Sequence, residues 1–382
     1  MGASVKKMLI NEYNETRAII DKSLICHAPF VNMNFDQSGI VNACCYNRSY
    51  ILGKYPQNSL SEIWFGNKSD QLRNYISKND LSHGCQLCAR QLAAKNFSSF
   101  KAKHYDIYPV KTAKTEILRI WPWRKKTIAQ DLSTQIMPQI MPQIMEFELS
   151  NICNLECVMC NGHFSSSIRQ NRDKLPPIVS PYDDKFIEQI LPFIPYLKEM
   201  KFLGGEPFMI PLYYNIWDKV LEINPTIRIH ITTNATMLNS RIKDLLQSMN
   251  VGLNISVDSV VRETYEKIRV NASFDKVMEN IYWLKDYTTA KGNFLWFSVC
   301  PITLNAYELP DLIKFTNDND IGVYFNTVTE PKKMSLKNLP KFELAKLIKF
   351  YQSNIQKSNS QIGQANHQAM LSLISQLEYW AA

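Results

Sequence analysis

The chain has 382 residues, 45% of them hydrophobic and 20% charged, which is ordinary for a globular protein of two or three domains and excludes a collagen-like or largely disordered chain. Lys and Arg number 43 against 35 Asp and Glu, and residues 90–126 alone hold ten basic and two acidic residues. The net charge of +8 is therefore carried by one segment, and the rest of the chain is balanced.

Nothing near the N-terminus is typical of a secretory signal, because the short apolar pieces there are broken by polar residues, and no apolar run is long enough to span a membrane. We therefore expect a cytoplasmic protein, in which thiols stay reduced. Nine cysteines occur: Cys26, Cys44, Cys45, Cys85, Cys88, Cys153, Cys157, Cys160 and Cys300. In a reducing compartment this set favours metal ligation over disulfides.

The first predicted unit, residues 1–95, contains five of the cysteines and a β-hairpin. Apolar residues 30–35 and 40–43 flank the sequence DQSG, which is typical of a tight turn. Four cysteines can close a four-iron cluster or hold a zinc ion, as in a zinc ribbon. The residues of this unit leave both possibilities open.

Residues 96–144 are predicted to connect this unit to the next one. The repeat QIMPQIMPQIM, residues 135–145, has proline at every fourth position, which excludes a helix interior and predicts an extended linker. The basic stretch 90–126 predicts a solvated helical connector. The alternative is a surface for an acidic partner, such as a peptide, a phosphorylated or nucleotide-linked sugar, or an electron-transfer protein. No nucleic-acid-binding module accompanies the stretch, so we do not expect a nucleic-acid partner.

Strands and helices alternate from residue 145 onward. Short apolar or β-branched runs predict six strands, at 145–149, 200–203, 227–232, 251–257, 294–299 and 323–326. Amphipathic stretches predict helices between them, at 185–191, 213–223, 241–249, 274–287 and 307–317. This alternation predicts a parallel sheet that wraps into a barrel or part-barrel, with the chemistry at the strand C-termini. The last unit, residues 331–382, is predicted to add one or two helices on the outside.

The first of these strands is followed by ELSNICNLECVMCNGH, residues 148–163, with the spacing Cys153-x3-Cys157-x2-Cys160. Three thiolates in a short loop can hold three irons of a cubane cluster and leave the fourth iron free for a ligand. The alternative is a structural zinc site completed by His163. The loop alone does not separate these two hypotheses.

Motifs downstream of the loop decide between them. Glycine and polar residues end the second, third and fourth predicted strands: Gly204, Gly205, Glu206 and Pro207; Thr232, Thr233 and Asn234; Ser256 and Asp258. With these motifs, residues 145–330 resemble the radical S-adenosylmethionine (SAM) superfamily. The resemblance implies an α/β fold with a six-stranded (β/α)6 part-barrel, and a [4Fe-4S] cluster bound by the three cysteines of the loop and by SAM. It also implies reductive cleavage of SAM to a 5′-deoxyadenosyl radical that abstracts a substrate hydrogen atom.

The same resemblance implies which residues bind SAM: Met159, Gly204, Gly205, Glu206, Pro207, Thr233, Asn234, Ser256, Asp258 and Asn305. The chain departs from the family pattern at two places, since Ala235 replaces a glycine and the glycines usual near Arg269 are absent. Cys300 ends the fifth predicted strand. By analogy with some epimerases it would donate a hydrogen atom to a substrate radical; the alternative is a buried core residue.

The N-terminal cysteines resemble the SPASM/Twitch auxiliary module of the same superfamily, which has a cysteine, a hairpin, a second cysteine and a later CxxC motif. This implies a second, closed [4Fe-4S] cluster whose four ligands are Cys26, Cys44, Cys85 and Cys88. Cys45 is then not a ligand. The module usually follows the barrel, whereas here it precedes it. One closed cluster is typical of the Twitch form.

Together these resemblances imply an enzyme that depends on a reductant such as flavodoxin or ferredoxin. By analogy with proteins that carry the auxiliary module, the predicted substrate is a ribosomally made peptide or protein. The alternative substrate is a sugar, amino-sugar or nucleoside-type small molecule. A hypothesis of another class, a non-catalytic iron-sulfur or zinc protein, does not explain the SAM motifs.

Overall fold

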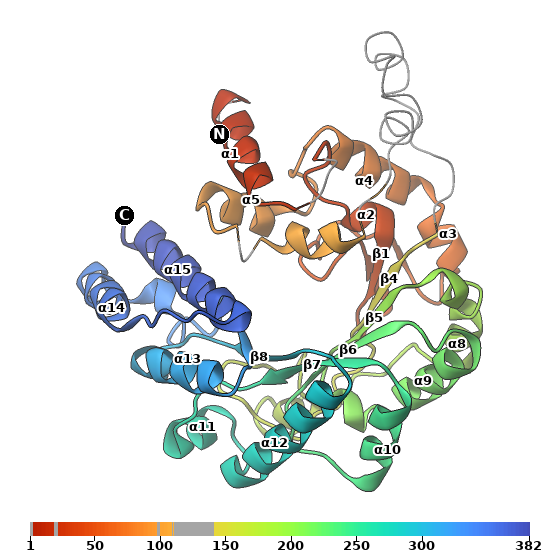
Figure 1. The fold of residues 1–382 in the computed structure, drawn as a ribbon. Coiled ribbons are helices and arrows are strands. Elements are labelled where there is room, and N and C mark those ends of the chain that lie inside the picture. Colours follow the sequence, from red (N-terminus) through yellow and green to blue (C-terminus); the bar gives the residue numbers. More distant parts are fainter. Residues whose placement is uncertain (1–2, 19–21, 98–99, 109, 111–140) are drawn as a thin grey trace.

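The structure is a computed structural model that describes residues 3–18, 22–97, 100–108, 110 and 141–382. Within these residues nine strands form one sheet, in the order β3-β2-β1-β4-β5-β6-β7-β8-β9. Their bounds are β1 Asn32–Phe35, β2 Ile40–Asn42, β3 Gly53–Lys54, β4 Ile144–Phe147, β5 Glu199–Phe202, β6 Arg228–Thr233, β7 Val251–Ser256, β8 Leu295–Val299 and β9 Gly322–Phe325. The sheet curves around a central space, and helices cover its outer face (Figure 1).

Strands β4 to β9 are all parallel, which confirms the predicted α/β part-barrel. The connections run through α7 (Ser166–Asn171), α8 (Asp184–Ile190), η2 (Ile194–Tyr196), η3 (Pro207–Met209), α9 (Pro211–Ile223), α10 (Ser240–Ser248), α11 (Arg262–Ile268), α12 (Phe274–Ala290), η4 (Ala306–Glu308) and α13 (Leu309–Asp318). All six predicted strands occur, each within about two residues of its predicted bounds.

Local side chains explain where several of these helices begin. The side chain of Asp183 accepts a hydrogen bond from the amide of Phe186 at the start of α8, and Asn239 caps α10 in the same way. Pro211 opens α9, at a position where no amide hydrogen is needed. The strands are thus separated by helices whose ends are encoded locally.

The N-terminal hairpin belongs to the same sheet as the barrel. Strand β1 pairs antiparallel with β2 and parallel with β4, where Asn34 lies opposite Glu146. The predicted hairpin is confirmed, although its first strand begins later than predicted, because Pro29 helps to open the short helix α2 (Ala28–Val31). The other N-terminal elements are α1 (Ala3–Glu15), α3 (Leu60–Trp64), α4 (Asn67–Ser77), α5 (Gln86–Ala93) and η1 (Lys101–Ile107). Since hairpin and barrel share a sheet, the boundary at residue 95 stays a prediction.

Two features of the predicted connector lie largely outside the described residues. These are the first part of the QIMP repeat and the basic residues from 111 to 126. The described part of the basic stretch includes α5 and η1.

Alternation along the strands determines which side chains face the central space. In β6, Ile229 and Ile231 belong to the hydrophobic core, whereas His230 and Thr232 line the interior of the barrel. The parallel register then aligns inward residues on neighbouring strands, so that Thr232 lies beside Asn254. Strands β6 and β7 thus present polar side chains to the interior of the barrel, while the isoleucines of β6 pack in the hydrophobic core.

The C-terminal helices α14 (Lys341–Asn354) and α15 (Gln361–Ala381) pack against each other. Both were predicted to lie on the outside, but residues of α15 line the central cavity. Helix α15 lies along β9, where Asn366 accepts a hydrogen bond from the amide of Val323 and donates to the carbonyl of Ile321. Asn96 of the N-terminal module donates to Gln376 of the same helix. Helix α15 thus connects the last strand to the N-terminal module. It also covers the edge of β9, where Asn366 bonds backbone groups that no further strand pairs with. None of the described helices combines the length and the apolar character that a membrane span requires.

Candidate active site

The loop after β4 presents Cys153, Cys157 and Cys160 on one short span of backbone. The amides of Glu156 and Val158 donate to carbonyl oxygens near the end of α11, at 3.1 and 3.0 Å. These bonds hold the middle of the loop against the segment that follows β7. The sequence separation between the two segments exceeds 100 residues, and the barrel brings them together.

The three thiols differ in burial but share an environment that disfavours the free thiolate. Cys157 is buried, and the other two are half-buried. Burial raises the pKa of Cys153 to about 12 and that of Cys160 to about 11. Because the thiolate is the form that binds metal, ligation at these positions releases protons.

Gly204 and Gly205 bring the end of β5 into direct contact with this loop. Both have positive φ, 78° and 42°. A Cβ atom at Gly205 would lie only 2.1 Å from the carbonyl oxygen of Ile152, the residue before Cys153. The resemblance implied that Gly204 and Gly205 bind SAM. The structure shows a further reason for glycine here, because only a residue without a Cβ atom lets this backbone lie so close to the cysteine loop.

The buried side chain of Glu206 ties the end of β5 to the end of β6. Its carboxylate accepts hydrogen bonds from the hydroxyl of Thr233 and the amide of Asn234, both at 2.7 Å. Burial raises the pKa of Glu206 to about 7, because these hydrogen bonds offset only part of the desolvation. Asn234 Nδ2 lies 3.9 Å from Cys153 Sγ, so the network reaches the loop. Three predicted SAM residues are thus brought together, with the carboxylate of Glu206 bonded inside the protein.

Asp258 forms a second buried network beneath the loop. Arg269 Nε donates to Asp258 Oδ2 at 2.6 Å, and Arg269 Nη1 lies 3.8 Å from Cys157 Sγ. The amide of Cys300 donates to the carboxylate of Asp258, and the side chain of Asn305 donates to its main-chain oxygen. The sequence did not assign a role to Arg269. The one feature that pointed to it was its position soon after Asp258, at the end of the fourth predicted strand. In the structure it links that carboxylate to a cysteine of the loop.

We expect Arg269→Lys to lower the free energy of unfolding by about 1–2 kcal/mol, because an ammonium group cannot contact Asp258 and Cys157 together as the guanidinium does. Denaturant unfolding of the anaerobic protein measures this change. Arg262→Lys is the matched control, since Arg262 pairs with Asp275 at the surface, where such pairs contribute little. Equal losses in the two variants would contradict the buried role of Arg269.

The remaining predicted site residues lie around the same strand ends. Met159 and Ser256 are half-buried, and Pro207 is buried at the start of η3. Cys300 lies beside Asp258 and is half-buried. The thiol that lines the central cavity is a different one, Cys45, so the role of Cys300 as a hydrogen donor stays a prediction.

The N-terminal module brings a second group of thiols together: Cys26, Cys44, Cys85 and Cys88. Burial raises the pKa of all four, and the thiols of Cys44 and Cys88 raise the pKa of Cys26 further. Cys45 has a different neighbour, because Lys101 opposes the effect of burial on its pKa. Cys45 also interacts with Cys44 and Cys88, so the choice of Cys26, Cys44, Cys85 and Cys88 as the four ligands stays a prediction.

Hydrogen bonds join the N-terminal module to the cysteine loop. Arg48 Nη2 donates to both carboxylate oxygens of Glu148, at 2.9 and 2.8 Å. Gln37 Nε2 donates to the carbonyl of His163 at 2.6 Å. Direct hydrogen bonds thus connect the N-terminal module to the segment that carries the cysteine loop.

The side chains gathered at both places are thiols, which are soft metal ligands. In the described part of the chain, no set of three or more His, Cys, Asp or Glu side chains is arranged to hold one metal ion. His163, the fourth ligand in the zinc hypothesis, packs its ring against Phe164 with 4.8 Å between centroids. Sets of three and four soft thiols suit iron-sulfur clusters, whose irons are spread over a cube.

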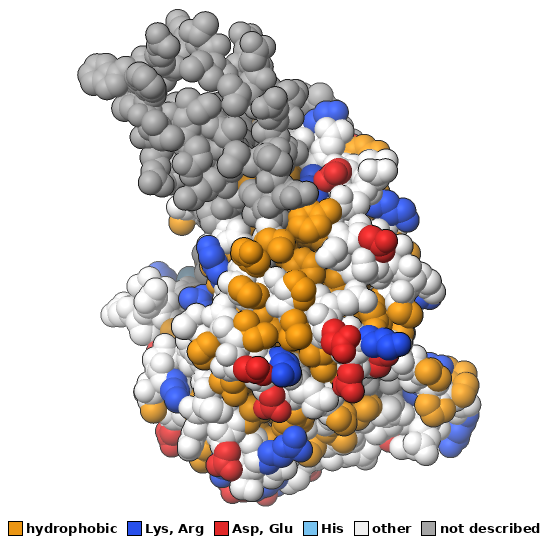
Figure 2. Space-filling view, turned by 90° about the vertical axis from the view of Figure 1, so that its right-hand side faces the viewer, with side chains coloured by type: hydrophobic (Ala, Val, Ile, Leu, Met, Phe, Trp, Pro, Cys, Tyr) orange, Lys and Arg blue, Asp and Glu red, His pale blue; other side chains and the backbone are white. Residues whose placement is uncertain are grey.

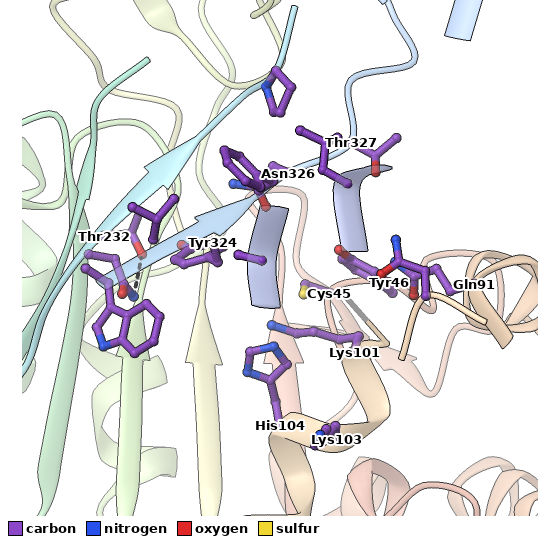
Figure 3. Close-up of a pocket in the computed structure, with 18 of the residues that line it drawn as sticks. Cys45, Tyr46, Gln91, Lys101, Lys103, His104, Thr232, Tyr324, Asn326 and Thr327 are labelled. Atoms are coloured by element: carbon purple, nitrogen blue, oxygen red, sulfur yellow. Dashed lines mark hydrogen bonds between the residues drawn. The ribbon is translucent and has the colours of Figure 1, made fainter. Parts of the chain in front are cut away.

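A cavity of about 650 Å³ fills the inside of the part-barrel (Figure 3). Its wall combines inward side chains of β4 to β9 with residues of η1 and α15. Two carboxylates on this wall, Glu146 and Glu199, share Lys201, whose Nζ lies 3.2 Å from each. Aromatic side chains such as Trp296 and Tyr324 complete a wall that offers both stacking surfaces and hydrogen-bonding groups.

Comparison with known families gives two matches that cover separate parts of the chain. Residues 147–315 match the radical SAM superfamily, from β4 to α13. Residues 26–89 match an iron-sulfur cluster-binding domain, which spans the hairpin and the N-terminal cysteines. Both predicted resemblances are confirmed, including the unusual order of the two parts.

Individual relatives are similar over part of their length. A probable GTP 3′,8-cyclase of Methanocaldococcus jannaschii is 28% identical over 182 residues, which cover 46% of this chain and 55% of the relative. The GTP 3′,8-cyclase of Limosilactobacillus fermentum is 26% identical over 193 residues, 47% of this chain and 52% of the relative. The chain thus spans about half the length of these relatives. The crystal structure of Streptococcus suis SuiB aligns with a TM-score of 0.42 and 17% identity, over 58% of this chain and 48% of that one.

Proposed function

We propose that the chain cleaves SAM at one cluster and uses a second, closed cluster in the reaction of its substrate, because residues 147–315 match the radical SAM superfamily and residues 26–89 match an iron-sulfur cluster-binding domain. The division of the thiols into a group of three and a group of four carries this proposal. The ligands of the first cluster would be Cys153, Cys157 and Cys160. The ligands of the second would be Cys26, Cys44, Cys85 and Cys88.

When bound, SAM and the reduced cluster supply a 5′-deoxyadenosyl radical that abstracts a substrate hydrogen atom. The residues of the chain prepare the site for that chemistry. Gly205 seats the strand end against the loop, Asn234 reaches Cys153, and Arg269 directs a donor at Cys157. Hydrogen bonds to a ligating sulfur tune a cluster, so Arg269 would help to set its reduction potential. A reductant such as flavodoxin or ferredoxin would supply the electron.

For the substrate, two observations favour a small polar molecule over a ribosomally made peptide. The cavity is bounded by η1 on one side and by α15 on another, and its volume is in the range of small-molecule sites. The relatives with the similar core act on a nucleotide, by their names. Modification of a peptide stays the alternative, supported by the presence of the auxiliary domain.

Anaerobic reconstitution followed by reduction tests the proposed function. We expect about eight irons per chain, since two four-iron clusters require them, and release of 5′-deoxyadenosine from SAM. Zinc in place of iron, or no cleavage on reduction, would refute it. Candidate small polar molecules and peptides can then be compared by how strongly each accelerates SAM cleavage, because a true substrate couples cleavage to turnover.

A further inference from the structure

Part of the basic stretch folds into the cavity instead of lying on the surface. The short helix η1 follows α5 and places Lys101, Lys103 and His104 on the cavity wall (Figure 3). All three come from the segment that carries the net positive charge of the protein. We call this group of three residues the basic edge of the cavity.

The ammonium group of Lys101 is opposed by burial, but the nearby charges of Cys45 and Glu146 keep its pKa raised; no anion contacts it directly among the residues that the structure describes. It makes no hydrogen bond or ion pair there, and its closest aromatic contact is the ring of Tyr46, 5.9 Å away. The carboxylate of Glu146 faces the same space, but it already pairs with Lys201 at 3.2 Å and accepts a hydrogen bond from Tyr105 at 3.0 Å. An ammonium group on a cavity wall without a direct hydrogen-bond partner is free to form charge-assisted hydrogen bonds with an anionic ligand.

The other members of the basic edge add hydrogen-bonding capacity. The imidazole of His104 is partly open to solvent at the cavity wall and adds a ring nitrogen that can form a hydrogen bond. Lys103 adds a second ammonium group. Lys101, Lys103 and Lys201 stand against Glu146 and Glu199, so these side chains give the wall one more positive than negative charge, and Lys201 is the lysine that contacts both carboxylates.

We propose that the basic edge binds an anionic oxygen group of the substrate, a phosphate or a carboxylate, on a small molecule held inside the barrel. This inference rests on the proposed function for the identity of the cavity as the substrate site. The cavity extends from η1 to Leu203 and Pro301, which adjoin Gly204 and Cys300 at the strand ends. A molecule anchored at the basic edge would therefore extend toward the cysteine loop, and its uncharged end would be the reacting one.

Thermal unfolding of the anaerobic full-length protein, without SAM or reductant, tests the anion site with defined probes. Ribose 5-phosphate and glutarate present a phosphate and a carboxylate, and ribose is the uncharged control. We expect at least one of the two anions to raise the unfolding temperature, as a ligand of the native state must, and ribose to leave it unchanged. Whichever anion acts identifies the source of the charge in the natural substrate.

Variants locate the effect. Lys101→Met keeps the length of the side chain and removes its charge, and we expect it to weaken binding of the active anion at least tenfold. Lys95→Met is the matched control, because Lys95 lies in the same basic stretch but pairs with Glu12 at the surface. We expect this variant to bind as the unchanged protein does. His104→Gln, which keeps a donor, provides a second variant if Lys101→Met does not fold, and we expect a smaller loss.

Two results would overturn the anion site. One is the absence of a shift with both anions, and the other is the same loss of binding in Lys95→Met as in Lys101→Met or His104→Gln. Binding is measured without radical chemistry, so it is independent of the proposed function. A protein that binds the anion at Lys101 but never cleaves SAM would refute the enzyme proposal and leave the site standing.

Discussion

Replacing Cys153 with alanine is expected to abolish formation of 5′-deoxyadenosine on reduction, with a loss of more than about 100-fold, and to remove about four irons per chain. The physical reason is that a cluster with one free iron depends on all three remaining thiolates. Cys153 is the cysteine of the loop that the side chain of Asn234 approaches, so the change also disturbs the network behind the loop. Chromatography of the SAM products and an iron assay on the same sample measure both effects.

Cys85→Ala is the matched variant in the other group of thiols. It should also lose about four irons, but it should keep part of the SAM cleavage, because the cysteine loop is not its neighbour in the structure. We expect its damage to appear in turnover of the substrate. If both variants lost cleavage and iron to the same extent, the assignment of two separate clusters would be wrong.

Gly205→Ala is expected to lower the free energy of unfolding by about 3–5 kcal/mol and to reduce SAM cleavage as well. The added methyl group would lie 2.1 Å from the carbonyl oxygen of Ile152, and a non-glycine residue is strained at a φ of 42°. Since the obstacle is backbone, the loop must move away from the strand end. Denaturant unfolding and SAM cleavage measure the two consequences.

Gly292→Ala is the control that separates the cost of a positive φ from the cost of a steric clash with the cysteine loop. Gly292 has a φ of 64°, but a Cβ atom there would meet nothing within 4 Å. This variant should lose only about 1 kcal/mol, the usual cost of alanine in the left-handed region, and its SAM cleavage should be unchanged. A loss at Gly205 no larger than at Gly292 would mean that close packing against the loop is not what requires glycine.

The sequence was sufficient to predict the barrel because each strand has a recognisable local pattern of apolar residues. The run from Val251 to Ser256 is apolar on alternate positions, with Val251, Leu253 and Ile255, and in the run from Arg228 to Thr233 the residues Ile229 and Ile231 alternate with polar residues. Such patterns depend only on which face of a strand is buried. The cysteine loop and the Gly-Gly pair could also be recognised, because each is a short contiguous motif and the two follow successive predicted strands.

Other parts of the site could not be read from the sequence, because they depend on distant contacts. A lysine-rich stretch is nearly always solvated, so nothing local distinguishes Lys101 in the cavity from Lys95 at the surface. Arg269 finds Asp258 and Cys157 only after the barrel has formed. The inward position of α15 depends on the bare edge of β9, which Asn366 satisfies from more than 40 residues away.

Joining β1 to β4 also constrains the order in which this chain can fold on the ribosome. The hairpin is made early, but its partner strand follows about 110 residues later, and α15 is made later still. Non-local pairing of this kind delays completion of a sheet. The cavity therefore stays open on one side until α15 arrives, while both groups of cysteines have already been synthesised. Cluster delivery during synthesis would act on a half-built barrel, and delivery afterwards would have to pass α15 and the N-terminal module, which face each other across the barrel (Figure 1). Figure 2 shows the side of the molecule away from α15, where hydrophobic side chains gather among charged ones.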